Sequence, residues 1–167
     1  EQSGMGPLAT AAHKEKVLGY IEKGIEEGAD LIMDGRGFKV DEYPNGFFVG
    51  PTLFDNVKPD MTIAKEEIFG PVVSVVRAKD LDEVIDLINT RGFANAACIY
   101  TYKGATAREF KYRVIPSMVG INIGIAAPMS FFPFGGSGNS MFGDTKAHGQ
   151  EIFNFFTDTK VVIQRWF

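Results

Sequence analysis

Cysteine and histidine are scarce: the 167 residues include one cysteine and two histidines. One cysteine excludes a disulfide framework within the chain and fits a reducing compartment, so we expect a cytoplasmic protein. His13 and His148 are too far apart in the sequence to suggest a metal site. A net charge of −4 also argues against the clustered Lys and Arg of a nucleic-acid surface.

Long apolar runs are missing as well. No run reaches the roughly 18 residues that a membrane span needs, and residues 1–6 lack the basic and apolar regions of a signal peptide. The first residue is Glu1 rather than methionine, which is compatible with a chain cut from a longer protein.

The motifs of phosphate binding and covalent catalysis are also absent. The run GSG at residues 136–138 is not a dinucleotide fingerprint, because Met141 stands where the third glycine belongs, and there is no P-loop lysine. Cys98 lies in an apolar segment, where we expect a buried and unreactive thiol. The sequence therefore offers no catalytic residue and reads as part of an enzyme rather than a whole one.

What the sequence does contain is an alternation of apolar segments and amphipathic helices. Thr10 and Asp80 are each placed to cap a helix, and Gly28 is placed to end the first one. This alternation of strands and helices indicates one compact α/β unit with a mostly parallel sheet flanked by helices. The pattern predicts helices at residues 11–27, 81–89, 105–114 and 145–153, extended segments at 31–33, 47–57, 72–77, 96–101, 119–123 and 159–166, and a long loop at 124–143. Since the run at 72–77 is continuously apolar, we expect a buried strand there.

The most informative stretch is EEIFGP at residues 66–71, just before that strand. Glu67 could accept hydrogen bonds from both hydroxyls of a ribose, with Phe69 as a flat apolar face for the same ligand. Alternatively, Glu67 pairs with Lys65 and Phe69 belongs to the core. Lys16 and His13, three residues apart on the first predicted helix, could reach an anionic cofactor or could be solvated surface.

Two further segments have an open interpretation. Residues 128–139, PMSFFPFGGSGN, could line an apolar substrate mouth, or their aromatic side chains could plug the core. The predicted extended segment at residues 159–166 comes after all the other predicted strands, with no neighbouring strand in the sequence to pair with. They could add to a sheet of another chain or form an ordinary edge strand.

The residues from 61 to 71, MTIAKEEIFGP, closely resemble the signature before a core strand of the aldehyde dehydrogenase catalytic domain. The resemblance covers essentially the whole chain, and further motifs fall in family order: MGPL at 5–8, GPT at 50–52, Asn122, PFGGSG at 133–138 and TDTK at 157–160. Within the family, residues 119–128 and the stretch from 154 to 166 look like the CoA-acylating methylmalonate-semialdehyde dehydrogenase branch.

This resemblance implies a role for each candidate residue. Glu67 would hold the nicotinamide ribose of NAD, Phe69 would pack beside the nicotinamide, and Lys16 would lie near the cofactor. Phe134 and Pro128 would lie at the substrate entrance. The resemblance also implies that the nucleophilic cysteine and the Rossmann domain lie upstream of Glu1. Residues 1–153 would then be the C-terminal part of the catalytic domain, and residues 154–167 a terminal strand that joins a homo-oligomer.

The intact enzyme would oxidise an aldehyde with NAD and pass the acyl group from a cysteine thioester to CoA, whereas this chain alone would be inactive. Phe142 stands where the semialdehyde branch usually has arginine. A part of a hydrolytic aldehyde dehydrogenase, with water as acyl acceptor, therefore stays open. So does a free-standing, non-catalytic assembly module of the same fold.

Overall fold

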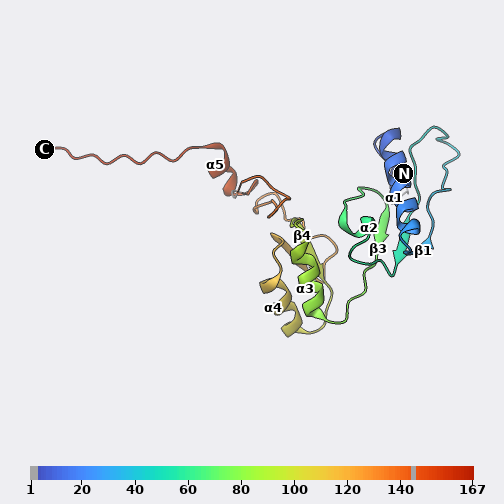
Figure 1. The fold of residues 1–167 in the computed structure, drawn as a ribbon. Coiled ribbons are helices and arrows are strands. Elements are labelled where there is room, and N and C mark those ends of the chain that lie inside the picture. Colours follow the sequence, from blue (N-terminus) through green and yellow to red (C-terminus); the bar gives the residue numbers. More distant parts are fainter. Residues whose placement is uncertain (1–3, 144–145) are drawn as a thin grey trace. The chain divides into compact units, whose positions relative to one another are not determined.

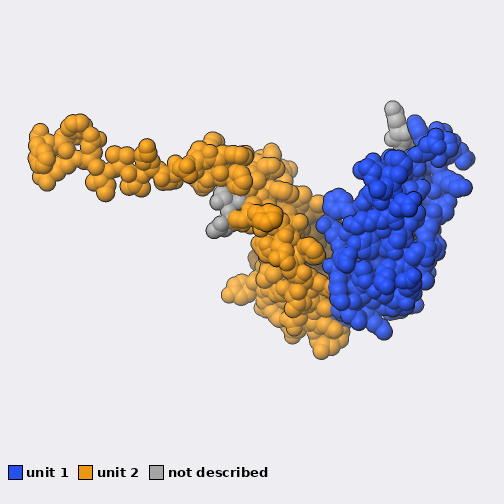
Figure 2. All heavy atoms as spheres, turned by 45° about the horizontal axis from the view of Figure 1, so that its top comes forward, with its two compact units in different colours: residues 1–78 blue, residues 79–167 orange. Residues whose placement is uncertain are grey.

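The computed structural model describes residues 4–143 and 146–167, and the chain forms two compact units, residues 1–78 and 79–167 (Figure 2). The expectation of a single compact unit is therefore wrong. The reason is that each half buries its own apolar cluster, one around Val17 and Phe54 and the other around Ile85 and Phe110. The two units are described separately below.

The first unit is a three-stranded sheet with two helices. It contains α1 (Ala11–Glu26), β1 (Asp30–Met33), β2 (Thr52–Asp55), α2 (Thr62–Lys65) and β3 (Val72–Ser74) (Figure 1). The strand order is β1-β2-β3, with β1 antiparallel and β3 parallel to the central β2. The predicted strands are present: β1 is one residue longer than expected, whereas β2 and β3 are shorter. The four-residue α2 was not predicted.

Local signals set both ends of α1, as predicted. The side chain of Thr10 caps the helix by accepting a hydrogen bond from the amide of His13 at 3.1 Å. Gly28 follows the helix with φ +87°, in the left-handed region that glycine adopts without strain. The buried face of α1 carries Val17 and Ile21, which pack in one cluster with Phe54 of β2.

The prediction of a buried strand at residues 72–77 is wrong in length and in burial. The strand β3 ends at Ser74, and Val73 is 59% exposed. A continuous apolar run is typical of a strand that is covered on both faces. Here one face of β3 contributes Val72 to the core, while the face that carries Val73 has no cover among the described residues.

The second unit has a two-stranded parallel sheet. It contains α3 (Leu81–Thr90), β4 (Ala96–Ile99), α4 (Gly104–Arg113), β5 (Met118–Ile121) and α5 (Glu151–Phe156). As predicted, Asp80 caps α3 by accepting a hydrogen bond from the amide of Glu83 at 2.9 Å. The helices α3 and α4 bury Ile85, Phe110 and the adjoining Val114 against the sheet.

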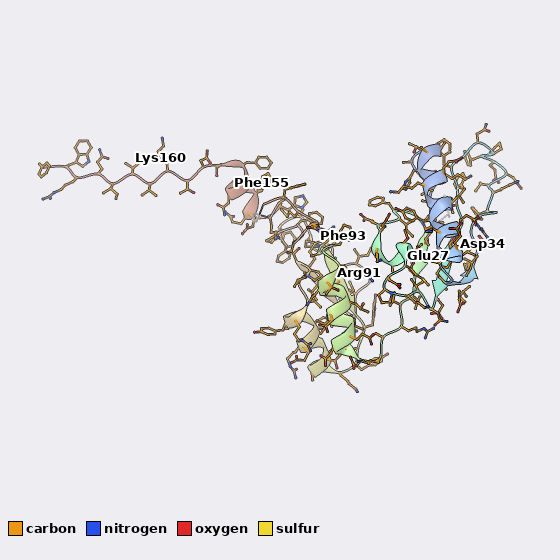
Figure 3. All side chains as sticks on the ribbon, in the orientation of Figure 1. Glu27, Asp34, Arg91, Phe93, Phe155 and Lys160 are labelled. Atoms are coloured by element: carbon orange, nitrogen blue, oxygen red, sulfur yellow. The ribbon has the colours of Figure 1, made fainter. Side chains whose placement is uncertain are left out.

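The last predicted helix begins later than expected. Residue 145 lies outside the described residues, and α5 begins at Glu151 because His148 and Gly149 have φ values of +68° and +58°, which no α-helix accommodates. Residues 157–167 are extended and exposed, without strand pairing among the described residues; Lys160 lies in this stretch (Figure 3).

The α/β class is confirmed, since helices flank both sheets and two of the three strand pairings are parallel. The expected single sheet is instead two. Among the described residues, no helix has the length and apolar character needed to cross a membrane.

Candidate functional site

The turn at residues 66–70 alternates between inward and outward side chains. Ile68 is 7% exposed and belongs to the core of the first unit, and Gly70 lies so close to α1 that a Cβ there would approach Val17 Cγ2 to 2.7 Å. The residues on either side of Ile68 are turned to solvent: Glu67 is exposed and Phe69 is 75% exposed. Glu67 and Phe69, the two predicted ligand contacts, are thus exposed together, while the backbone between and after them packs against the core and α1.

The backbone at Phe69 is unusual. Its φ is +60°, a left-handed conformation that a side chain with a Cβ rarely adopts. The carbonyl oxygen of Phe69 lies 2.7 Å from Nε2 of His13, so the imidazole donates a hydrogen bond from Nε2. Strained backbone of this kind is concentrated at functional sites.

Tyr20 of α1 and Glu27, the residue that follows this helix, make two further contacts with the chain from Thr62 to Glu66. The hydroxyl of Tyr20 donates to Glu66 Oε2 at 2.6 Å, and this hydrogen bond is the main reason why the pKa of Tyr20 is raised. Glu27, at the end of α1 (Figure 3), accepts from the amide and from the hydroxyl of Thr62, both at 2.6 Å. These two hydrogen bonds lower the pKa of Glu27.

The structure separates the alternatives for Glu67 and Lys16. Glu67 has no ion pair or hydrogen bond among the described residues, so the alternative pairing with Lys65 is not formed and the carboxylate is available to a ligand. Phe69 is not a core residue. The ammonium group of Lys16 lies 5.5 Å from the ring centroid of Tyr20, as a cation–π contact, and the side chain is exposed.

An open apolar pocket of about 480 Å³ lies beside Phe69. Phe69, Gly70 and Pro71 form part of its lining, and the rest comes from the chain before α1 and from the residues before β2: Met5, Gly6, Leu8 and Val49. The first unit therefore presents an exposed aromatic ring and a free carboxylate on one short turn, with an apolar pocket beside it.

The second unit contains the other predicted site residues. Phe134 is 41% exposed, exchanges two backbone hydrogen bonds with Ala147 and stacks on His148 at a centroid distance of 5.4 Å. Pro128 is half-buried. Phe131 and Phe132 are 64% and 54% exposed, so these aromatic side chains do not plug the core. His148 is exposed and lies in a loop, although the sequence predicted a helix over residues 145–153.

Cys98 lies in β4, as predicted, but it is half-buried rather than fully buried. Its Sγ is 4.0 Å from the carbonyl oxygen of Gly124, the range of a weak sulfur hydrogen bond. The described residues contain no group of three His, Cys, Asp or Glu side chains that could hold a metal ion. The geometry of residues 4–143 and 146–167 thus assigns neither a nucleophile nor a metal centre.

Sequence reasoning missed Tyr20 and Glu66 and left the contact of His13 open. A signal existed in part, because His13, Tyr20 and Glu27 are spaced seven residues apart on one helix. Their partners, however, lie 35 to 56 residues further along the chain. No local pattern indicates such pairings.

Comparison with known proteins identifies the class of this α/β chain: it matches a family of oxidoreductases. The aldehyde dehydrogenase family matches residues 1–162, and the chain belongs to this family. A malonate-semialdehyde dehydrogenase of Halalkalibacterium halodurans is 50% identical over 162 residues, which are 97% of this chain and 33% of that protein. A malonate-semialdehyde dehydrogenase of Pseudomonas aeruginosa is 48% identical, with the same coverage. The chain thus spans about a third of the length of the curated relatives it matches.

Solved structures agree with this assignment. A methylmalonate-semialdehyde dehydrogenase from Oceanimonas doudoroffii superimposes with a TM-score of 0.96 at 44% identity, covering 99% of this chain and 34% of that one. An aldehyde dehydrogenase of Mycobacterium tuberculosis complexed with NAD+ gives a TM-score of 0.82 at 35% identity, covering 92% of this chain and 31% of that one. The resemblance predicted from the sequence is confirmed at the level of the family and its semialdehyde branch.

Proposed function

We propose that this chain provides the nicotinamide side of the cofactor site and the substrate entrance in an NAD-dependent semialdehyde dehydrogenase. The observation that carries the proposal is the turn at residues 66–70, where the side chains of Glu67 and Phe69 are both exposed. The turn itself is held by the buried Ile68 and by hydrogen bonds from α1 to the Glu66 carboxylate and to the Phe69 carbonyl. The names of the relatives support the substrate class, and the NAD+ complex of a family member supports the cofactor.

The residues of the turn fit an NAD molecule chemically. The free carboxylate of Glu67 can accept hydrogen bonds from ribose hydroxyls, and the exposed ring of Phe69 offers an apolar face beside the pocket of about 480 Å³. Lys16 supplies a cation on the neighbouring helix for an anionic group. When bound, NAD supplies the acceptor for hydride; the protein residues named here bind and orient it.

We further propose that Phe134 and Pro128 lie at the aldehyde entrance and that CoA receives the acyl group in the intact enzyme. The exposed aromatic side chains of the 129–134 loop support an apolar entrance. The CoA assignment depends on the semialdehyde relatives alone. If acyl-CoA does not form and the free acid does, the hydrolytic alternative is correct.

Residues 154–167 are proposed to pair with a second copy of the chain in a cytoplasmic homo-oligomer, with residues 1–153 as part of the catalytic domain. In support, Val161, Val162 and Ile163 are 80%, 72% and 94% exposed on an extended backbone, and an unpaired extended segment can add to a sheet edge. The non-catalytic assembly module remains the rival proposal. It predicts that the native protein functions without nucleotide.

The proposed function is tested by Glu67→Gln in the intact enzyme that contains this chain. Charge-assisted hydrogen bonds contribute about 1.5–3 kcal/mol, so we expect NAD binding or hydride transfer to fall by about tenfold or more. Glu42→Gln, which changes an exposed carboxylate outside the turn, is the control and should behave as wild type. Unchanged NAD binding and turnover in Glu67→Gln would remove this carboxylate from the site. The chain alone, mixed with NAD, CoA and an aldehyde, should form no NADH.

A further inference from the structure

The segment from α2 to Phe69 runs antiparallel along α1 and is fastened to it at regular intervals. Going backwards along α1, Glu27 bonds to Thr62, Tyr20 bonds to Glu66, and His13 bonds to the carbonyl of Phe69. Seven residues are nearly two helical turns, so these three side chains share one face of α1, about 10 Å apart along its axis.

The spacing on the opposing segment matches. Three residues of chain, from Glu66 to Phe69, can span at most about 10 Å, which is similar to the rise of the two helical turns from Tyr20 to His13. Between those two hydrogen bonds the only inward side chain is that of Ile68, which is 7% exposed. The backbone that carries Glu67 is thus held at both ends and in the middle.

We infer that His13 and Tyr20 are positioning residues, which hold the 66–70 turn from both ends so that Glu67 and Phe69 meet the nicotinamide riboside half of the cofactor together. This inference rests on the proposed function of the turn. The hydrogen bond from His13 has the specific effect of satisfying the carbonyl of a residue whose φ of +60° is strained. The Tyr20 hydroxyl, in turn, fixes the carboxylate next to Glu67, so that Glu66 cannot take its place.

The closeness of α1 to the turn is not adjustable. A Cβ on Gly70 would approach Val17 Cγ2 to 2.7 Å and Cγ1 to 2.9 Å, closer than carbon atoms pack. The contact at Gly70 already sets the distance between the turn and α1. The hydrogen bond from His13 therefore acts on the orientation of the peptide group that carries the Phe69 carbonyl. That orientation decides on which side the ring of Phe69 emerges.

The test begins with the chain itself and requires no cofactor. We would record the backbone and Cβ resonances of Phe69 and Gly70 by NMR in His13→Ala, in His13→Gln and in Tyr20→Phe. His13→Ala should shift Phe69 out of the left-handed region, whereas His13→Gln retains a side-chain N–H donor and should restore most of the wild-type pattern. Wild-type Phe69 resonances in His13→Ala would overturn the inference.

The second arm uses the same variants in the intact enzyme. Loss of one net hydrogen bond should weaken NAD binding about threefold to tenfold and lower kcat, with the KM for aldehyde unchanged and with recovery in His13→Gln. A purely structural role would lower stability without moving the KM for NAD of the folded enzyme. The exposed Glu15 and Tyr112 provide the matched controls Glu15→Gln and Tyr112→Phe, which should leave kcat and the KM for NAD unchanged.

Two failures are distinguishable. If Glu67→Gln weakens NAD binding but His13→Ala and Tyr20→Phe do not, the two hydrogen bonds do not serve the site, and the inference is overturned while the proposed function stands. If Glu67→Gln has no effect either, the proposed function fails, and the inference about the cofactor fails with it.

Discussion

The packing of α1 can be tested with two glycines of the same helix. Gly19 is exposed, and a Cβ added there would meet no atom within 4 Å. Gly24 is buried, and its Cβ would lie 2.9 Å from Ile63 Cδ1 and 3.0 Å from Phe54 Cζ. Replacing each by alanine changes the helix propensity by a similar amount and differs only in what the new methyl group meets.

The two substitutions should change the stability of α1 in different directions. Alanine is favoured over glycine inside a helix by about 0.8–1.0 kcal/mol, so Gly19→Ala should stabilise α1 by that amount. Gly24→Ala has the same gain, but overpacking costs about 1–3 kcal/mol, because the fully buried ring of Phe54 cannot move aside. The net effect at Gly24 should lie between about zero and 2 kcal/mol of destabilisation.

Hydrogen exchange of peptides from α1 measures this locally, without assuming that the two units unfold together. In Gly19→Ala the most protected amides should exchange about four- to fivefold more slowly. In Gly24→Ala they should exchange at the wild-type rate or faster. Equal slowing in both variants would refute the packing of α1 on β2 and α2 described here, and with it the placement of the 66–70 turn.

Two further predictions concern polar contacts of the first unit. The pKa of Glu27 is lowered from its usual value of 4.5 by its hydrogen bonds with Thr62, so its stabilising contribution is complete above that value and is lost as the pH falls through the lower folded-state pKa. Urea titrations at decreasing pH should show this loss in wild type and not in Glu27→Gln, and identical pH profiles would contradict it. Thr52 is 2% exposed and accepts a hydrogen bond from the amide of Gly35 at 3.1 Å. Thr52→Val keeps the side-chain shape and should lower the free energy of unfolding in urea by about 1–3 kcal/mol, because the buried amide of Gly35 loses its acceptor. Thr52→Ser keeps the hydroxyl and should cost less. An unchanged free energy of unfolding in Thr52→Val would show that the Gly35 amide finds another partner.

The sequence predicted those elements whose ends are set by local chemistry. Thr10 and Asp80 accept hydrogen bonds from amides three residues ahead, and Gly28 takes a left-handed conformation, so α1 and α3 begin or end where these residue types indicate. The short α2 could not be predicted, because four residues are too few to show a helical period.

Burial and long-range pairing were less predictable. The apolar run at 72–77 has the composition of a strand covered on both faces, yet composition does not say what provides the cover. For residues 159–166 the pattern indicates an extended backbone, but strand hydrogen bonds need a partner that this stretch does not identify. At the candidate site, the family motif predicted Glu67 and Phe69, whereas the hydrogen bond from His13 spans 56 residues of sequence.

The left-handed backbone of Phe69 places stability and activity in opposition at one residue. A residue with a Cβ costs roughly 1–2 kcal/mol in that conformation, and because the ring is 75% exposed, little burial compensates for it. Glycine would adopt the same φ without strain, but it would remove the aromatic face. Selecting variants of this protein for thermal resistance alone would therefore favour loss of the ring. A screen for robust mutants needs cofactor binding as a second criterion, or it will discard the site while improving the fold.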